Sequence, residues 1–253
     1  MKKVTVVTVA AAVVALSSAS AMAQANNSNI INSRHNLNAV QAGSYNVGNV
    51  TSTQICVYCH TPHGARQSVP IWNRNVGVSA AAFTLYSSVT MLNKKHATGF
   101  TPDSISLFCM SCHDGSMLGG NMIHNTATFG KFYGVVGTLN DAVIATSARL
   151  GADLTQTHPV NFQASLALNT DANNPQRRND GNPDLNFTDA NTMGPVNNAT
   201  GLTSTKTFPL FASQGQSGYL ECSSCHSVHD DYYRPFLRDT MDNSQLCLGC
   251  HNK

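Results

Sequence analysis

Four short stretches of the chain share one pattern, in which two cysteines stand three positions apart and a histidine follows the second. They are Cys56-Val-Tyr-Cys59-His60, Cys109-Met-Ser-Cys112-His113, Cys222-Ser-Ser-Cys225-His226 and Cys247-Leu-Gly-Cys250-His251. We call them motifs 1 to 4 in chain order. They contain all 8 cysteines of the 253-residue chain, so no cysteine remains for another purpose.

The pattern Cys-x-x-Cys-His is the attachment motif of c-type haem. Two thiols at this spacing form thioethers with the vinyl groups at one edge of the porphyrin, and the following imidazole ligates the iron as proximal ligand. Two alternatives are open: exported cysteine pairs form disulfides, and motifs 3 and 4 are spaced nearly as in a zinc ribbon. Neither explains a histidine after every pair, because the chain has only 10 histidines. We therefore expect four covalently bound haems, with their iron held by His60, His113, His226 and His251.

The composition favours a chain that is mostly coil. Only 11% of the residues are charged and 7% are aromatic, whereas ordinary soluble domains carry roughly 25% charged residues. The 26 asparagines and 18 glycines favour turns over long helices. We expect a multihaem c-type cytochrome fold, mostly coil with short helices and few short strands, wrapped around four haems that supply the missing apolar burial. The composition argues against a charged DNA-binding domain, a coiled coil and a multi-span membrane protein.

The chain begins like a secretory signal peptide. Lys2 and Lys3 precede an apolar run that ends in small residues at Ala21-Met22-Ala23, and the run is too short to span a bilayer comfortably. A buried N-terminal helix is the alternative, but it does not explain why the cationic start and the small-residue end occur together. We expect residues 1–23 to be removed and residues 24–253 to form a single tetrahaem domain, with a long polar loop region over residues 169–217.

Short helices are expected to lead into two of the motifs. Thr101-Pro102-Asp103-Ser104 supplies a capping residue and a proline suited to a first turn, ahead of a helix over residues 105–112. Asp242-Asn243-Ser244 does the same ahead of a helix over residues 246–250. We expect a short strand over residues 132–136 and, from the density of Asn, Gly and Pro, a turn-rich loop over residues 169–205.

Six histidines remain as candidates for the second axial ligands: His35, His63, His96, His124, His158 and His229. His63 and His229 each stand three residues after a proximal histidine, and three residues span at most about 10 Å. That reach is too short to pass round the rim of the same macrocycle, so each can cap only a neighbouring haem. Pro159 holds His158 extended, which is a rigid way to present an imidazole. The residues alone leave His35, His96 and His124 open, together with thioether ligation by Met110, Met117 or Met122.

Seven stretches follow one another in a recognisable order: CVYCHTPHG (56–64), PIWNRN (70–75), LYSSVT (85–90), CMSCHDG (109–115), DLTQTHPVNF (153–162), CSSCHSVH (222–229) and LCLGCH (246–251). Together they resemble the exported tetrahaem c-type cytochromes of metal-reducing bacteria, in particular the OmcE-like group that polymerises into haem-chain nanowires. The resemblance implies that the distal ligands are His35, His63, His158 and His229. Residues 126–150 and 169–217 take no part in it.

These observations favour an electron carrier and not an enzyme, because imidazole on both faces of each iron leaves no position for a substrate. The resemblance implies a subunit of an extracellular filament at the outer cell surface, a head-to-tail homopolymer whose other partners are redox proteins or extracellular electron acceptors. In such a filament, one hypothesis is that His35 reaches a haem of an adjacent subunit. No nucleic-acid partner and no membrane span are expected. A soluble periplasmic tetrahaem shuttle and a multihaem reductase with one open iron are the alternatives.

Overall fold

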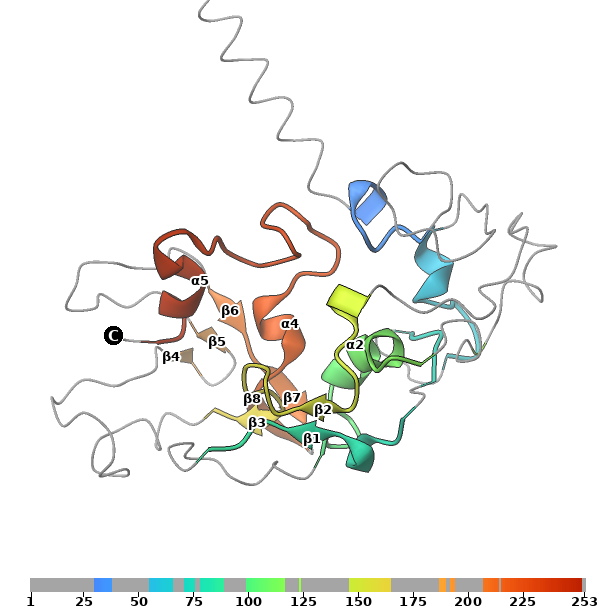
Figure 1. The fold of residues 1–253 in the computed structure, drawn as a ribbon, viewed down its shortest axis with the longest axis horizontal. Coiled ribbons are helices and arrows are strands. Elements are labelled where there is room, and N and C mark those ends of the chain that lie inside the picture. Colours follow the sequence, from blue (N-terminus) through green and yellow to red (C-terminus); the bar gives the residue numbers. More distant parts are fainter. Residues whose placement is uncertain are drawn as a thin grey trace, which may run out of the picture.

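The structure, a computed structural model, describes residues 30–37, 55–65, 71–75, 78–88, 99–116, 123, 146–164, 187–189, 192–193, 207–213 and 215–251. Within these residues the elements are short and much of the chain is irregular (Figure 1). The longest helix there, α2, covers Ser106–His113, and the longest strand, β8, covers Gln216–Leu220. The prediction of mostly coil with short helices and few short strands is confirmed. No helix in this part of the chain has the length and apolar character needed to cross a membrane.

The strands form three small sheets. β1 (Thr84–Leu85) pairs in parallel with β2 (Asp153–Leu154). An antiparallel sheet has the order β3-β8-β7, with β3 at Phe162–Gln163 and β7 at Phe211–Ser213. A second antiparallel sheet has the order β4-β5-β6, formed by Phe187–Asp189, Thr192–Met193 and Phe208–Pro209. All strands are short, so the sheets contribute local pairing and not an extended layer.

The expectation of a long polar loop over residues 169–217 is wrong where the structure has strands. β4 to β7 and the first residues of β8 lie inside this range, and β4 and β5 lie inside the expected turn-rich loop over residues 169–205. The physical reason is that residues which discourage helices also close tight antiparallel turns, so short strands pair on either side of them. The strand expected over residues 132–136 lies outside the described residues.

The helices begin and end close to the predicted positions. α2 is shifted by one residue from the range 105–112, and Ser104 Oγ accepts a hydrogen bond from the Ser106 N–H at 3.2 Å. α5 covers Gln245–Leu248 within a series of turns that continues to Cys250, near the predicted range 246–250. The remaining helical elements are α4 at Cys222–Cys225 and the 3₁₀ turns η1 at Ile30–Asn32, η2 at Ile55–Tyr58, η3 at Ala80–Ala82, η6 at Thr146–Ala148 and η9 at Asp242–Ser244.

Two small clusters of buried apolar side chains form the core. The first contains Phe83, Leu85, Phe100, Leu107, Met110 and Leu154, and it joins α2 to the β1–β2 pair. The second contains Phe208, Leu210 and Leu220, next to Leu246 of α5 and Cys250 of motif 4. Met110 is 0% exposed and belongs to the first cluster, which argues against its thioether as an axial ligand. Met117 and Met122 lie outside the described residues.

The carboxylate of Glu221 joins segments that are far apart in the sequence. Its side chain is buried, Oε2 accepts hydrogen bonds from Ser104 Oγ at 2.9 Å and from Ser106 Oγ, and Oε1 accepts one from Asn161 Nδ2 at 3.0 Å. The Ser106 hydroxyl also accepts the N–H of Cys222 at 3.0 Å. These bonds tie the first turn of α2 to the first turn of α4.

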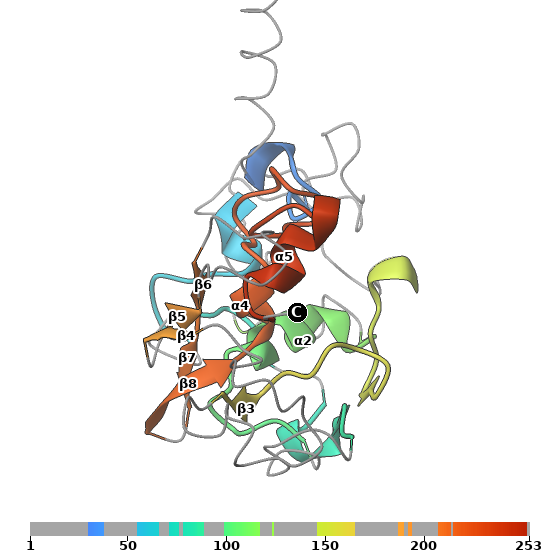
Figure 2. The same ribbon diagram turned by 90° about the vertical axis from the view of Figure 1, so that its left-hand side faces the viewer.

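Glu221 is also the N-cap residue of α4. Its backbone N–H donates to Ser224 Oγ at 3.0 Å, which completes a capping box. Figures 1 and 2 show α4 between α2 and the strand β6, and it contacts both. Burial raises the pKa of the Glu221 carboxyl above its usual value. The hydrogen bonds from Ser104, Ser106 and Asn161 lower this pKa, but their effect is smaller than that of burial.

A glutamine at position 221 is expected to change the pH dependence of stability. Because the folded protein holds the Glu221 proton more tightly than the unfolded chain, the free energy of unfolding decreases as the pH rises from the ordinary value of 4.5 through the raised pKa. Glu221→Gln removes this decrease, since an amide does not titrate. Glu221→Leu leaves three buried donors without their acceptor and costs about 1–3 kcal/mol. Urea unfolding at several pH values measures both effects.

Asp242→Asn is the matched control, because Asp242 is an exposed acid in a turn and its replacement is expected to leave the slope as in the wild type. An identical pH slope in the wild type and Glu221→Gln would contradict the assignment.

Candidate functional site

Each motif contains a helical turn that gathers its three functional side chains. In three motifs the backbone N–H of the histidine donates to the backbone carbonyl of the first cysteine. The distances are 2.8 Å for His60 and Cys56, 3.0 Å for His226 and Cys222, and 2.8 Å for His251 and Cys247. Motif 2 forms the last residues of α2. Positions i, i+3 and i+4 lie on one side of a helical turn, so two thiols and an imidazole are presented together.

No disulfide joins any two of the eight cysteines, all of which lie among the described residues. Burial raises the pKa of Cys59 and Cys250 to about 12 and that of Cys225 to about 11. Such thiols are neutral at neutral pH and are poor nucleophiles. In the part of the chain that the structure describes, no three His, Cys, Asp or Glu side chains converge as metal ligands. The geometry thus gives no support to the disulfide and zinc-ribbon alternatives.

Thiols of successive motifs lie beside one another. A hydrogen bond directly joins the thiols of Cys109 and Cys222, which raises the pKa of the first and lowers that of the second. Electrostatic contacts connect the other neighbours: Cys59 with Cys112, and Cys225 with both Cys247 and Cys250. The four motifs therefore follow one another in space in the order of the sequence.

Three of the proximal histidines face three of the expected distal histidines. The ring centres are 6.3 Å apart for His35 and His113, 6.1 Å for His60 and His229, and 6.2 Å for His158 and His251. A metal–imidazole bond of about 2 Å, with about 1.1 Å more to the ring centre, places two imidazoles on opposite sides of one metal ion about 6 Å apart. The residues present therefore fit a metal ion held between the two rings of each pair.

Backbone carbonyls orient several of these imidazoles. The Nδ1–H of His113 donates to the Ala148 carbonyl at 2.7 Å, and that of His158 donates to the Pro159 carbonyl at 2.9 Å. His226 donates in the same way to the Pro235 carbonyl at 3.1 Å. A carbonyl can only accept, so Nδ1 carries the proton and Nε2 keeps its lone pair for a metal ion.

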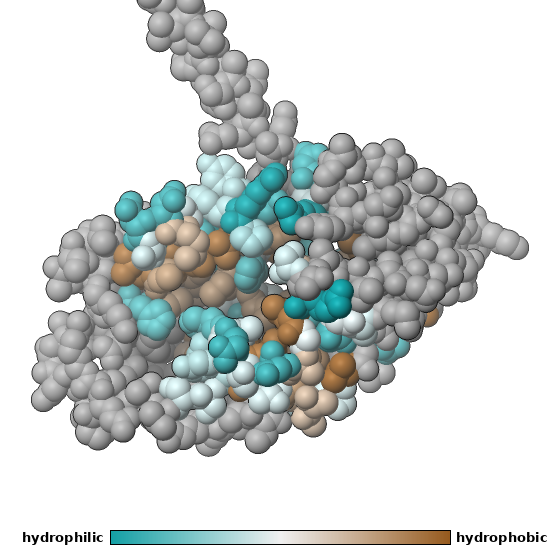
Figure 3. Space-filling model, viewed as in Figure 1, coloured by the Kyte–Doolittle hydropathy of each residue, from teal (hydrophilic) through white to brown (hydrophobic). Residues whose placement is uncertain are grey.

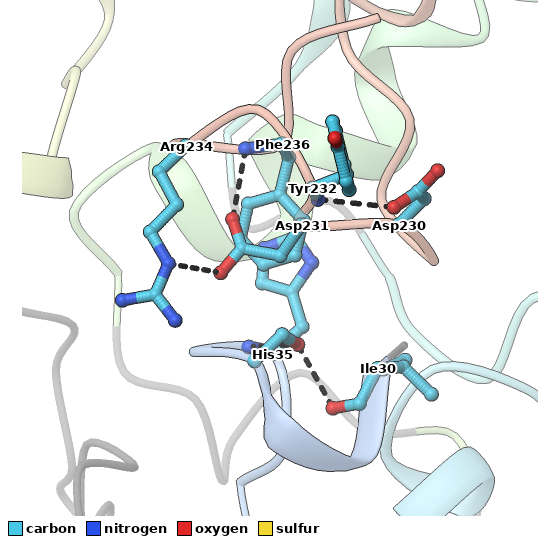
Figure 4. A network of polar contacts seen from close by, with 8 residues as sticks. Ile30, His35, Asp230, Asp231, Tyr232, Arg234 and Phe236 are labelled. Carbon is cyan, nitrogen blue, oxygen red and sulfur yellow. Dashed lines mark hydrogen bonds and ion pairs between the residues drawn. The ribbon is translucent and has the colours of Figure 1, made fainter. Parts of the chain in front are cut away.

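His35 is held inside its own chain. Figure 4 shows its ring stacked on Phe236, with ring centres 4.1 Å apart, and its Nδ1 lies 3.3 Å from the Val228 carbonyl. The Phe236 N–H donates to Asp231 at 3.1 Å, and Arg234 pairs with the same carboxylate at 3.4 Å. Burial lowers the pKa of His35 to about 4, so its imidazole is neutral at neutral pH. In this chain His35 lies beside His113 of motif 2, and its reach to a haem of an adjacent subunit stays a prediction.

His63, the remaining expected distal ligand, forms no such pair among the described residues. His63 is exposed, and among the described residues no imidazole lies opposite His226 at the spacing of the other three pairs. His96 and His124 lie outside the described residues.

Sequence reasoning missed the role of the PIWNRN stretch. The Trp72 indole lies edge-on to the His60 ring, with centres 5.5 Å apart, and donates to Ser111 Oγ at 3.1 Å. It also packs against Phe108, with ring centres 5.3 Å apart. Trp72 thereby connects motif 1 to α2, which carries motif 2. Trp72 is the single tryptophan of the chain, and this was the feature of the sequence that could have indicated its structural role.

A comparison with known families agrees with the pattern of the cysteines. The family described as a doubled CXXCH motif matches residues 215–253, which contain motifs 3 and 4. No curated protein matches the chain. The doubled motif is that of haem-binding c-type cytochromes, and the match is consistent with a multihaem c-type cytochrome that transfers electrons.

Gly249 is the only glycine between the two cysteines of a motif, and the structure has no room for a side chain there. The corresponding residues of the other motifs are Tyr58, Ser111 and Ser224, so the motif itself does not require glycine. A Cβ at position 249 would overlap the ring of Phe208 in the second core cluster. Gly249→Ala is expected to destabilise the protein by about 1–3 kcal/mol through overpacking, measured by thermal unfolding.

The double variant Gly249→Ala with Phe208→Leu separates this contact from a general effect. Removing the ring makes space for the methyl group, so the two changes together are expected to cost less than the sum of the single changes. Additive effects would show that the Phe208 ring is not the obstacle.

Proposed function

We propose that the protein is a tetrahaem c-type cytochrome that carries electrons along a chain of four haems. The observation that carries this proposal is the spacing of 6.1 to 6.3 Å in three histidine pairs, each of which joins a motif histidine to one that the sequence marked as a distal ligand. The doubled motif over residues 215–253 supports haem binding independently.

The residues of each site have defined tasks. The two cysteines of every motif hold a haem by thioethers, and bound haem supplies the one-electron couple of its iron. His60, His113, His226 and His251 are the proximal ligands. His229, His35 and His158 occupy the opposite faces at motifs 1, 2 and 4, where they exclude water and substrate. His63 is the proposed ligand opposite His226, since the pairing of His60 with His229 brings the segment of His63 towards motif 3.

The surface around the motifs supports the proposal. Figure 3 shows hydrophobic residues over the region of α5 and near the middle of this face, where the surface is hollowed. Apolar macrocycles packed against such residues would bury further apolar surface, and each Å² buried stabilises the fold by about 25 cal/mol. The two small core clusters bury little apolar surface by themselves. The neighbouring thiols of successive motifs support an order of haems that follows the sequence.

Removal of a distal histidine is expected to change the spin state of one iron. Bis-imidazole ligation gives low-spin ferric haem, so His158→Ala is expected to add one high-spin ferric signal in electron paramagnetic resonance spectra. Gln156→Ala, an exposed residue on the same segment, is the matched control and keeps the wild-type spectrum. Mass spectrometry with four haem additions verifies loading in each variant. An unchanged spectrum in His158→Ala would reject His158 as a ligand.

The same measurement decides between carrier and enzyme. The unpaired position of His226 among the described rings favours a second candidate, a multihaem reductase with one open iron. A high-spin signal in the wild-type protein supports the reductase, and purely low-spin spectra that gain a high-spin signal in His63→Ala support the carrier.

We further propose that the protein is secreted and assembles head to tail into an extracellular filament, with redox proteins or extracellular acceptors as partners. The support is the resemblance to the OmcE-like group over the seven stretches between residues 56 and 251. A soluble periplasmic shuttle is the runner-up.

Negative-stain microscopy of the secreted protein tests this assembly. We expect filaments of uniform width that lengthen with protein concentration, and discrete particles over the whole concentration range would support the shuttle.

A further inference from the structure

The segment Ile71–Asn75 lies between motif 1 and α2. On one side, the Asn73 N–H donates to the Cys59 carbonyl at 2.8 Å and the Thr61 N–H donates to the Ile71 carbonyl at 2.9 Å. On the other side, Arg74 Nη2 lies 3.5 Å from the Ser111 carbonyl, which it approaches as a donor. Backbone and side-chain bonds thus fix this segment against both of the first two motifs.

Arg74 places a buried positive charge between these motifs. Its side chain is 1% exposed and is the largest of the fully buried side chains among the described residues. A guanidinium stays charged at any pH at which a protein is folded. Its Nη2 lies 3.5 Å from the carbonyl of Ser111, the residue before Cys112, and the adjacent residue Asn73 donates its backbone N–H to the Cys59 carbonyl at 2.8 Å. Arg74 is therefore close to the attachment points of motif 1 and motif 2 at once.

We propose that Arg74 is a shared electrostatic residue that raises the reduction potentials of the two haems attached at motifs 1 and 2. This inference rests on the proposed haem-binding function. Reduction adds one negative charge to each haem, and a nearby positive charge in a buried environment of low dielectric constant favours the reduced form. A single side chain therefore stabilises the electron at two neighbouring sites.

The haem's own propionates do not cancel this effect, because they leave the porphyrin at the edge opposite the vinyl groups to which the cysteines attach. Two acids oppose Arg74 at motif 2: Asp114 acts on the Cys112 thiol, less strongly than Arg74 does, and Glu221 acts on the Cys109 thiol. At Cys112 the effect of Arg74 therefore exceeds that of Asp114.

Arg238 provides a contrast in the second half of the chain. It is only partly buried, donates Nε–H to the Ser223 carbonyl at 2.9 Å, and acts on the Cys225 thiol of motif 3. Arg238 thus lies beside motif 3, whereas Arg74 contacts motif 2 from a segment that is also bonded to motif 1.

Potentiometric titration of purified holoprotein tests the proposal. Arg74→Met fills the same buried space without a charge, and replacement of a buried ion by an apolar residue is often tolerated. We expect two of the four reduction potentials to fall in Arg74→Met. The expected fall is at least a tenfold change in the one-electron equilibrium constant, which corresponds to about 59 mV. Arg74→Lys retains the charge. For both haems it is expected to keep the one-electron equilibrium constant within threefold of the wild-type value. Arg238→Gln is the control and is expected to leave these two potentials unchanged.

Four haem additions in the mass spectrum keep the two proposals distinct. A wild-type protein without haem would reject the proposed function before Arg74 is tested. Fully loaded Arg74→Met with wild-type potentials would overturn the role of Arg74. Equal shifts in Arg74→Met and Arg74→Lys would do the same, because they would assign the effect to shape and not to charge. If Arg74→Met does not fold, Arg74→Lys decides: a shift in its two potentials overturns the proposal, and unchanged potentials support it.

Discussion

The hydrogen bonds of one buried carboxylate hold the middle of the molecule together. Glu221 accepts bonds from the turn before α2 and from Asn161, and it caps α4. Because motif 2 ends α2 and motif 3 forms α4, this carboxylate fixes the distance between them, and the thiols of Cys109 and Cys222 come into hydrogen-bond contact. A buried acceptor with several donors is directional and costly to leave unsatisfied. It therefore specifies a single arrangement where the apolar core is too small to do so.

The histidine pairs extend this constraint over the whole chain. His60 of motif 1 faces His229, which follows motif 3, and His251 of motif 4 faces His158. His35, from the first described segment, faces His113 of motif 2. Each pair joins residues that are far apart in the sequence, so the two halves are interlocked. Proposed metal bonds between the rings convert these contacts into cross-links, which gives a chain with short elements a defined tertiary structure.

The sequence predicted the parts of the site that depend on local spacing. Two thiols and an imidazole within five residues lie together on one helical turn, whatever surrounds them, and the predicted helices before motifs 2 and 4 are present. It could not predict β4 to β7 within residues 169–217, because strands of two or three residues depend on pairing partners elsewhere. The roles of Arg74 and Glu221 escaped it for the same reason: a lone charged residue does not reveal whether it is buried or which segments it contacts.

The amino-acid sequence by itself determined the number of Cys-x-x-Cys-His motifs, the candidate ligands within them and the small share of regular structure among the described residues, because covalent spacing and turn propensity act over a few residues. Only the tertiary structure decided which histidine lies beside which motif, that His35 stacks on Phe236 next to motif 2 and that Arg74 lies between motifs 1 and 2. These are contacts between distant segments, and they are set by the packing and buried hydrogen bonds of the whole fold.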